Sequence, residues 1–290
     1  MTTTTWAIEL GIEPKYEAAL TASAKKAGYE VLHPVALPFG GGFLQDQEGE
    51  EPFYTDPEEM REIIYHGSIQ GCKTLKARYV ENDCGWWKTY FDSKKYECSY
   101  YYPRLKNLIL NHEHFFMPWG CFTESRELIG ELFPEWRNAD GADPVFVRPS
   151  SGEKHFTGMT VFPGNTRELW AKDMKFMNFY EMLKPETMVV VAPPQNIVKE
   201  WRFFVSDGEV VTGSLYKLGV DLNQRPADEY ELKMAADFAA AASKTYNPDK
   251  VWVMDICETK SGSKHILEVG AASCSGLYEC DTDKLVEAMS

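Results

Sequence analysis

The pattern of apolar and polar positions predicts a strand–helix–strand unit at the start of the chain. Residues 5–10 (TWAIEL) and 29–35 (YEVLHPV) are compact apolar runs typical of strands. Between them, residues 13–28 have a helical pattern, with a proline near the first turn and Gly28 as a stop. Residues 61–69 (REIIYHGSI) predict a third strand. This order of elements indicates a small α/β unit.

From Val145 onward, short apolar runs alternate with turn residues. Asp207-Gly208 is a strong two-residue turn signal and predicts a β-hairpin around it. Helices are expected over residues 166–183 and 226–246. The strands expected in this half occupy residues 145–149, 154–162, 187–194, 198–217 and 251–270, the last two ranges being hairpins.

Composition narrows the possible functions. The chain has 290 residues, 44% of them hydrophobic, which is enough apolar material for one large domain or two to three small ones. Its formal net charge of -14 argues against a general nucleic-acid or anionic-membrane binder, although a local basic pocket is compatible with it. The chain shows no secretion signal and no long apolar run, and its seven cysteines are scattered. We therefore expect a cytoplasmic protein with reduced thiols.

Two carboxylates interrupt the apolar runs of the last hairpin (VWVMDICETKSGSKHILEVG). If Ser261-Gly262 forms a two-residue turn, Asp255 lies opposite Glu268, with Cβ atoms about 5 Å apart. Like charges so placed destabilise each other unless a cation lies between them, and Mg²⁺ prefers such oxygen ligands. An edge strand with solvated acids, or a register shifted by one residue, explains the pattern equally well.

Basic residues follow one of the predicted strands. Arg148 lies near the end of the strand over residues 145–149, and Lys154 follows a loop of small residues, 150–152, whose backbone amides can approach an anion. This is neither the Walker A pattern nor the dinucleotide fingerprint. Taken alone, it favours a surface hairpin with ordinary flanking charges over a polyphosphate site.

Arg202 is a second candidate for a phosphate contact. In the Asp207-Gly208 hairpin it shares a face with Glu200 and, counted across the turn, lies opposite Gly213. One interpretation is a structural ion pair with Glu200. The other is an arginine aimed at charge on a transferring phosphoryl group, because its planar fork suits phosphate better than lysine does.

The order of these segments resembles the ATP-grasp superfamily, and within it the clade named for its two arginines and one lysine. The segments that carry the resemblance are VFVRPSSGEKHFTG, VVVAPPQNIVKEWRFFVSDGEVVTGSLY and VWVMDICETKSGSKHILEVGAASCSGLY. The resemblance implies a mixed α/β and α+β fold in three parts. An N-terminal α/β pre-ATP-grasp domain would occupy residues 1–85, and two α+β subdomains over residues 86–187 and 188–290 would clasp ATP.

The resemblance also implies an ATP-dependent carboxylate–amine ligase. The γ-phosphoryl group would move to a carboxylate, and an amine would attack the acylphosphate, with release of ADP and phosphate. The implied partners are ATP, Mg²⁺, a carboxylate donor and an amine acceptor such as an amino acid, a peptide or a protein terminus, in a bacterium or bacteriophage. Neither a membrane nor nucleic acid is expected as a partner.

The same resemblance assigns roles to individual residues. Arg202 would stabilise the acylphosphate, and Asp255 and Glu268 would hold Mg²⁺. The residues that would contact the phosphates are Arg148, Lys154 and Lys217. The other positions implied at the nucleotide are Met188, Val189, Val190, Val191 and Ala192 beside the adenine, together with Glu200.

Other interpretations of the chain stay open. Gly270 stands where many ATP-grasp enzymes have an asparagine metal ligand, so a protein that binds nucleotide without efficient turnover is one alternative. A kinase on the same scaffold is another. His112 and His114 would share a strand face, as zinc ligands can, but no cysteine pair at finger spacing accompanies them, so a structural role is favoured.

Overall fold

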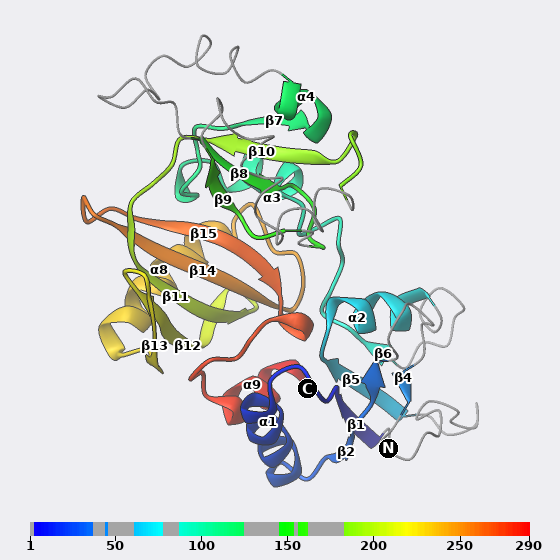
Figure 1. Cartoon of the computed structure of the whole chain (residues 1–290). Helices are drawn as coiled ribbons and strands as arrows, with labels where there is room; N and C mark the ends of the chain where they lie inside the picture. The colour runs from blue at the N-terminus through cyan, green and yellow to red at the C-terminus, as the bar shows by residue number, and fades with distance from the viewer. Residues whose placement is uncertain are drawn as a thin grey trace. The chain divides into compact units, whose positions relative to one another are not determined.

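The structure is a computed structural model, and it describes residues 3–36, 44–45, 61–77, 87–124, 145–153, 156–161 and 183–290. The chain forms two compact units that interleave in sequence (Figure 1). The first unit contains Met1–Asp92, Val198–Cys257 and Glu268–Ser290, and the second contains Ser93–Ile197 and Glu258–Leu267.

The first unit begins with a parallel sheet in the strand order β2-β1-β5-β6. Its elements are β1 (Thr3–Ile8), α1 (Pro14–Lys26), β2 (Glu30–Leu32), β5 (Arg61–His66), α2 (Ile69–Leu75) and β6 (Trp87–Lys88), with a small hairpin of β3 (Val35–Ala36) and β4 (Leu44–Gln45). Pro14 is the first residue of α1, and Gly28 just beyond its end has a φ of 86°. The predicted strand–helix–strand unit is therefore confirmed.

The first unit also contains most of a five-stranded sheet in the order β13-β12-β11-β14-β15. Its strands are β11 (Ile197–Ser206), β12 (Glu209–Leu218), β13 (Asp221–Pro226), β14 (Val251–Thr259) and β15 (Lys264–Ala271). The β11–β12 turn is Asp207-Gly208, as predicted, and both residues have positive φ, as a type I′ turn requires.

Two helices complete the first unit. Helix α8 (Glu229–Ala242) packs against β12 and begins at Asp228, whose side chain caps it. Helix α9 (Thr282–Met289) follows the short helix η6 (Ala272–Cys274) and lies beside α1 (Figure 1). A continuous apolar core joins the two sheets of this unit through residues that include Trp6, Ile8, Leu20, Phe204, Val253 and Leu285.

The register of β11 and β12 differs from the expectation by one residue. Arg202 lies opposite Ser214, and Gly213 lies opposite Phe203. A bulge between Phe204 and Val205 causes the shift, because the count across the turn assumed a regular ladder. Gly213 therefore accommodates Phe203 rather than Arg202: a Cβ atom at Gly213 would lie 2.2 Å from the Phe203 ring.

The second unit is built on an antiparallel sheet in the order β7-β10-β8-β9. Its elements are α3 (Cys98–Leu105), η3 (Lys106–Leu108), β7 (Phe115–Pro118), α4 (Trp119–Glu124), β8 (Val145–Pro149), β9 (Met159–Val161) and β10 (Met188–Ala192). Trp119, Phe122, Val147 and Val189 belong to its core. The strands predicted around Arg148 and Val190 are confirmed. The helix expected over residues 166–183 lies, except for its last residue, outside the described residues.

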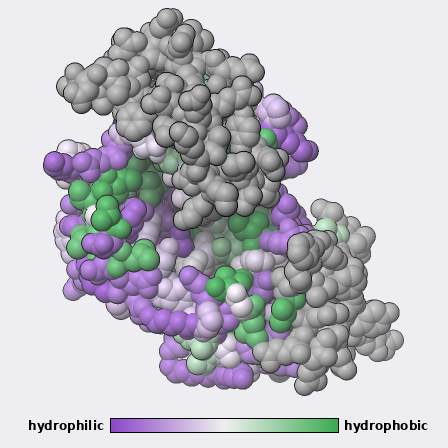
Figure 2. All heavy atoms as spheres, in the orientation of Figure 1, coloured by the Kyte–Doolittle hydropathy of each residue, from purple (hydrophilic) through white to green (hydrophobic). Residues whose placement is uncertain are grey.

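The surface of the described residues is mixed in character. The coloured atoms in Figure 2 are mostly hydrophilic, with separate hydrophobic patches among them. Val220, Leu222 and Tyr230 are the most exposed of the large apolar side chains that the structure describes. No helix within the described ranges is long and apolar enough to cross a membrane.

Candidate active site

A buried ion pair joins β11 to β14 in the first unit. Arg202 Nε donates to Asp255 Oδ1 at 2.8 Å, and Nη2 donates to Oδ2 at 2.7 Å. Arg202 is 7% exposed and Asp255 is 2% exposed. Burial alone lowers the pKa of Arg202, but Asp255 outweighs this effect and holds the pKa well above its ordinary value. The cation that balances the Asp255 carboxylate in this structure is therefore Arg202, in the strong two-pronged geometry.

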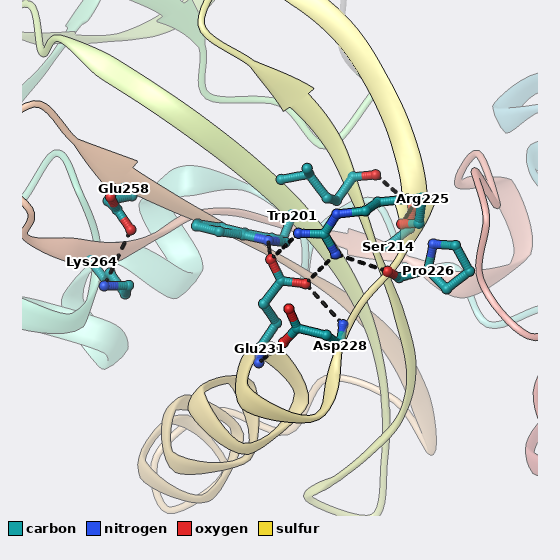
Figure 3. Close-up of polar contacts among 9 residues, drawn as sticks. Trp201, Ser214, Arg225, Pro226, Asp228, Glu231, Glu258 and Lys264 are labelled. Atoms are coloured by element: carbon teal, nitrogen blue, oxygen red, sulfur yellow. Dashed lines mark hydrogen bonds and ion pairs between the residues drawn. The ribbon is translucent and has the colours of Figure 1, made fainter.

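The alternation of side chains along β11 explains how Arg202 reaches Asp255. Trp201, the preceding residue, points to the opposite face and donates from Nε1 to Glu231 of α8 at 2.7 Å (Figure 3). Arg225 of β13 holds the same carboxylate through both Nη atoms at 2.7 Å. Burial raises the pKa of Glu231, but the hydrogen bonds from Arg225, the Asp228 N–H and Trp201 outweigh it and lower the pKa. These contacts anchor α8 to the sheet and fix the face that Arg202 occupies.

Glu200 pairs with β12 rather than with Arg202. Its carboxylate accepts from Lys217 Nζ at 2.7 Å and from the Tyr216 hydroxyl at 2.7 Å. Burial, Asp255 and Glu200 together raise the pKa of Tyr216, so its hydroxyl stays protonated and donates. Of the two interpretations of Arg202, the ion pair with Glu200 is not the one formed, because Arg202 Nε and Nη2 donate to Asp255 instead.

Three tyrosines form a contiguous aromatic group next to Arg202. The rings of Tyr216 and Tyr278 stack at 4.6 Å with an angle of 11° between their planes. Tyr16 meets Tyr278 edge-on at 6.3 Å, and its hydroxyl donates to Gln224 at 2.8 Å. The Arg202 guanidinium carbon lies 4.9 Å from the Tyr278 ring centroid, within cation–π distance. The Arg202 side chain is thus held by an ion pair and by aromatic faces.

A small pocket lies within the first unit beside this group. It has a volume of about 60 Å³ and is lined by Glu9, Ile12, Glu13, Tyr16, Glu17, His66, Gly67, Cys274, Ser275, Gly276 and Leu277. The charged residues in this lining are glutamates. Glu9 and His66 follow or end parallel strands, and the carboxyl ends of parallel strands are a common place for ligands in α/β proteins.

Two of the three glutamates are committed to other groups of the protein. Glu9 accepts from the Tyr65 hydroxyl and from Ser68 N at 2.6 Å. Glu17 accepts from the backbone N–H groups of residues 11–13. The Glu13 carboxylate accepts no hydrogen bond from any residue that the structure describes, so it is available to a ligand.

His66 lines the pocket with a neutral imidazole ring. Burial lowers its pKa to about 4, so the ring is neutral at pH 7. The ring hydrogen-bonds the Ser275 backbone, while its buried Nε2 atom has no partner among the described residues. A neutral ring that donates from one nitrogen accepts at the other. Because this Nε2 atom is buried, the acceptor available to a donating ligand in the pocket is the Glu13 carboxylate.

Gly276 connects the pocket to Arg202. Its carbonyl accepts from Arg202 Nη1 at 3.1 Å. A Cβ atom at Gly276 would lie 3.5 Å from Arg202 Nη1, 3.6 Å from Glu13 Oε2 and 4.0 Å from the Tyr278 ring. The acidic pocket and the buried arginine thus meet at a single backbone position.

The hairpin that carries the expected metal ligands has a longer turn than predicted. Thr259 N donates to Ser263 O at 2.9 Å, and Gly262 N donates to Thr259 O at 2.8 Å. The loop therefore has three residues, with Gly262 at positive φ, and Lys260 does not face Ser263. Continued along a regular ladder, this register would place Asp255 opposite Leu267 instead of Glu268.

The base of the hairpin indicates a compensating bulge. A Cβ atom at Gly270 would lie 3.8 Å from the Val253 Cβ, which makes these two residues neighbours on one face. Between the pairs Thr259–Ser263 and Val253–Gly270, the second half of the hairpin has eight residues (263–270) and the first half has seven (253–259). In a regular strand, buried and exposed side chains alternate. Leu267 and Glu268 are consecutive and both partly exposed, which is what a bulge at this point produces. A regular ladder counted from Val253 would place Asp255 opposite Glu268.

The nucleotide-binding positions expected in the second unit are mostly within strands. Val189 to Val191 are buried, and they pair with β7 on one side and with β8 on the other. Their backbone is therefore already hydrogen-bonded, while Met188 is 41% exposed at the strand start and Ala192 pairs with Phe146. Arg148 lies opposite Val190 on β8. Lys154 lies outside the described residues.

The loop of small residues after Arg148 packs against the start of α3. Ser150 accepts from Cys98 N through its carbonyl at 2.7 Å and from Ser99 N through its hydroxyl at 3.2 Å. A Cβ atom at Gly152 would lie 2.8 Å from the Ser93 carbonyl oxygen. The small residues of this loop are therefore required by its packing.

His114 has a structural environment, as the sequence favoured. Its Nδ1 atom lies 2.8 Å from the Asn111 carbonyl oxygen, and its ring packs edge-on against Tyr102 and Phe116. His112 stacks instead with His265 at 6.2 Å. Within the described residues, no group of three or more His, Cys, Asp or Glu side chains has metal-binding geometry.

Sequence reasoning missed Glu13, His66, Gly276 and Tyr278. The ends of the parallel strands were a usable signal for His66, because such ends converge on one edge of the sheet. Gly276 and Tyr278 carried no comparable signal, since they reach the site only through the path of the chain after β15.

Comparison with known proteins identifies the family. The model of the second family in the ATP-grasp clade named for two arginines and one lysine matches residues 125–288. No curated protein sequence matches the chain. D-cycloserine synthetase DcsG is similar in structure with a TM-score of 0.63 and 13% identity, over 98% of each chain. D-alanyl-alanine synthetase A from Vibrio cholerae has a TM-score of 0.59 and 12% identity, over 100% of this chain and 98% of that one.

A third similar structure is the ATP-grasp ligase PsnB complexed with a minimal precursor. Its TM-score is 0.54 at 10% identity, over 99% of this chain and 98% of that chain. At such identities the likeness concerns the fold, and all three structures agree with the fold that the family model implies. The chain adopts the ATP-grasp fold and belongs to the second family of the two-arginine, one-lysine clade of ATP-grasp domains.

Proposed function

We propose that this protein is an ATP-dependent ligase that joins a carboxylate to an amine. The γ-phosphoryl group of ATP moves to a carboxylate oxygen, which gives an acylphosphate and ADP. The amine then attacks the acyl carbon, phosphate leaves with the C–O bonding electrons, and the amine nitrogen loses a proton. The observation that carries the proposal is the buried Arg202 hydrogen-bonded to Gly276 of an acidic pocket's lining, in a chain of the ATP-grasp family.

The cationic residues account for most of the chemistry in this proposal. Phosphoryl transfer depends on positioning and charge neutralisation, so it needs no nucleophilic side chain. Arg202 stabilises the charge that develops near the acylphosphate, while Arg148 and Lys154 contact the phosphates. Lys217 uses one N–H for Glu200, and its other donors are available to a phosphate oxygen. The end of β10, from Ala192 onward, contacts the adenine.

Mg²⁺ fits the two carboxylates of the last hairpin. Asp255 and Glu268 offer the oxygen ligands that Mg²⁺ prefers. Asp255 also accepts two hydrogen bonds from Arg202. Together the two carboxylates would hold the ion, and phosphate oxygens would supply further ligands. When bound, the ion neutralises charge on the transferring phosphoryl group.

The acidic pocket suggests which substrate group is bound there. Glu13 presents a carboxylate, and an ammonium group supplies donors and a positive charge. A volume of about 60 Å³ holds a compact group such as an amino terminus and its adjacent carbon. We infer that an amino acid or peptide amine is bound here. PsnB has been captured with a precursor peptide and AMPPNP, which supports a peptide among the candidates.

The second candidate is a nucleotide-binding protein with impaired turnover. Gly270 supplies no side-chain ligand, and Asp255 is paired with Arg202. Such a protein would bind Mg·ATP and release no ADP with any acceptor. A kinase on the same scaffold would release ADP and leave a stable phosphorylated product in place of an amide.

A product assay separates these possibilities. The protein is incubated with Mg·ATP and a panel of amino acids and short peptides that supply both carboxylates and amines. The proposal predicts ADP and phosphate in amounts equal to a new amide, detected by mass spectrometry. AMP and pyrophosphate would contradict it, and binding of Mg·ATP without turnover would favour the second candidate.

A further inference from the structure

Tyr278 has an unusual backbone conformation for a bulky residue. Its φ is 50°, in the left-handed region that glycine and asparagine adopt more readily than aromatic residues do. Such a conformation costs free energy, so it persists only where the surroundings hold it in place. Conformations of this kind cluster at functional sites, and Tyr278 adjoins the segment that forms one wall of the pocket.

The contacts of the Tyr278 ring identify what the conformation achieves. The ring stacks on Tyr216 at 4.6 Å and places its face 4.9 Å from the Arg202 guanidinium carbon. It also meets Tyr16 of the pocket wall in an edge-on contact. A regular extended or helical φ at residue 278 would direct the ring elsewhere and remove all three contacts.

The electrostatic surroundings of Tyr278 agree with this position. Burial raises the pKa of the phenol, Arg202 lowers it, and Asp255 and Glu13 raise it further. The ring is therefore influenced by Arg202 and Asp255 and also by the glutamate of the pocket. Gly276, two residues earlier, lies within 4 Å of Arg202, of Glu13 and of the Tyr278 ring when a Cβ is placed on it.

We propose that Tyr278 is a positioning residue that holds the Arg202 guanidinium against Asp255 and the Gly276 carbonyl, at the wall of the amine pocket. Its contribution comes from the ring face, so phenylalanine suffices at this position. Without the ring, Arg202 loses one side of its enclosure, and its charge is no longer fixed where the acylphosphate forms. The role in catalysis rests on the proposed ligase function, whereas the positioning itself does not.

Two variants separate the ring from the backbone strain. Tyr278→Asn keeps a residue that tolerates positive φ but removes the ring. Tyr278→Phe keeps the ring and removes the hydroxyl. We expect kcat to fall about 30-fold in Tyr278→Asn with the KM for Mg·ATP little changed, because the lost effect is one of orientation. Tyr278→Phe should stay within about threefold of the original protein.

A measurement without turnover tests the positioning directly. Hydrogen exchange of Arg202 Nε–H is followed by NMR on the whole protein with ¹⁵N-labelled arginine and tryptophan, with the arginine signal assigned by its loss in Arg202→Lys. Trp201 Nε1–H, on the neighbouring residue but the opposite face, is the internal control. In Tyr278→Asn, Arg202 exchange should accelerate at least about tenfold while Trp201 exchange stays nearly constant.

The outcomes distinguish this inference from the proposed function. Equal acceleration at Arg202 and Trp201 would show a global loss of stability and overturn the inference, and so would no acceleration at Arg202. Equal effects in Tyr278→Phe and Tyr278→Asn would also overturn it, because the ring would then not be the cause. If no carboxylate and amine support ADP release, the ligase proposal fails, while the exchange rates still decide the role of Tyr278.

Discussion

Arg202 donates two hydrogen bonds to Asp255, one to each carboxylate oxygen, and both side chains are buried. This pair changes how the two acids in the last hairpin are understood. An arginine from the neighbouring strand already balances one of them, so a metal ion is not needed as the counter-ion of Asp255. Substitution of Asp255 therefore tests the fold as well as the chemistry.

Asp255→Asn should destabilise the protein strongly. The change leaves a buried guanidinium without its counter-ion, which typically costs about 3–5 kcal/mol in the free energy of unfolding. Urea denaturation measures this loss. Asp283→Asn is the control, because its carboxylate pairs with Lys26 at the surface and its removal should have little effect. Equal stability of Asp255→Asn and the original protein would contradict the importance of the buried pair.

Glu268→Gln should separate metal binding from stability. Glu268 is partly exposed, and glutamine keeps its shape, so the free energy of unfolding should change by less than about 1 kcal/mol. The Mg²⁺ concentration needed for half-maximal ADP release should rise at least about tenfold, since a proposed metal ligand loses its charge. Glu258→Gln, on the same hairpin but paired with Lys264, should leave the Mg²⁺ requirement unchanged. An unaltered requirement in Glu268→Gln would remove this residue from the metal site.

Gly276→Ala should block the pocket without disturbing the fold. The added methyl group fits, with its nearest neighbours at 3.5 and 3.6 Å, but it occupies the place where the pocket meets Arg202 and Glu13. We expect the KM for the amine substrate to rise at least about tenfold, with the thermal midpoint and the KM for Mg·ATP retained. Steady-state kinetics with varied amine provides the measurement. A KM increase for ATP alone would show that the pocket is not the amine site.

Gly67→Ala should be far more damaging than Gly276→Ala. A Cβ atom at Gly67 would lie 2.4 Å from both the Glu9 carboxylate and the Tyr65 hydroxyl. These two groups are hydrogen-bonded to each other, so neither can move away without breaking a buried contact. We expect a loss of about 1–3 kcal/mol or more in the free energy of unfolding, as for overpacked cores. A stable Gly67→Ala variant would show that the Glu9–Tyr65 contact is not fixed.

Stability should decrease as the pH falls through the range in which free histidine titrates. Burial holds the pKa of His66 at about 4, below its ordinary value of 6.5. Between these two values the unfolded chain binds more protons than the folded protein, so acid favours unfolding. The expected loss from pH 7 to 4 is about 1–3 kcal/mol from this residue, reduced by the opening of the ring to the pocket. His66→Gln should flatten the dependence, and an unchanged slope would contradict the assignment.

The local elements were predictable because their signals are local. Pro14, Gly28 and the Asp207-Gly208 turn set their own backbone angles, so the first helix and the β11–β12 hairpin were found at nearly the right limits. The position of Arg202 on one face of its strand followed from alternation alone. The partner of Arg202 did not, because Asp255 is 53 residues away and reaches it only through the sheet order.

Bulges account for most of the errors of register. Because of the bulge beside Phe204, the cross-strand partner of Gly213 is Phe203 and not Arg202. At the end of β14, a three-residue loop replaces the expected two-residue turn. Neither feature has a reliable signal in a single sequence. The pocket was missed for a different reason, since it combines the ends of β1 and β5 with residues 274–277, which lie about two hundred residues further along the chain.

The transfer of oxygen from the substrate to phosphate tests the central claim most directly. The carboxylate substrate found in the product assay is labelled with ¹⁸O, and the phosphate formed with ADP is analysed by mass spectrometry. An acylphosphate intermediate predicts one ¹⁸O atom in each phosphate released, because the carboxylate oxygen leaves with the phosphoryl group. Unlabelled phosphate, or ¹⁸O found in AMP, would contradict the account.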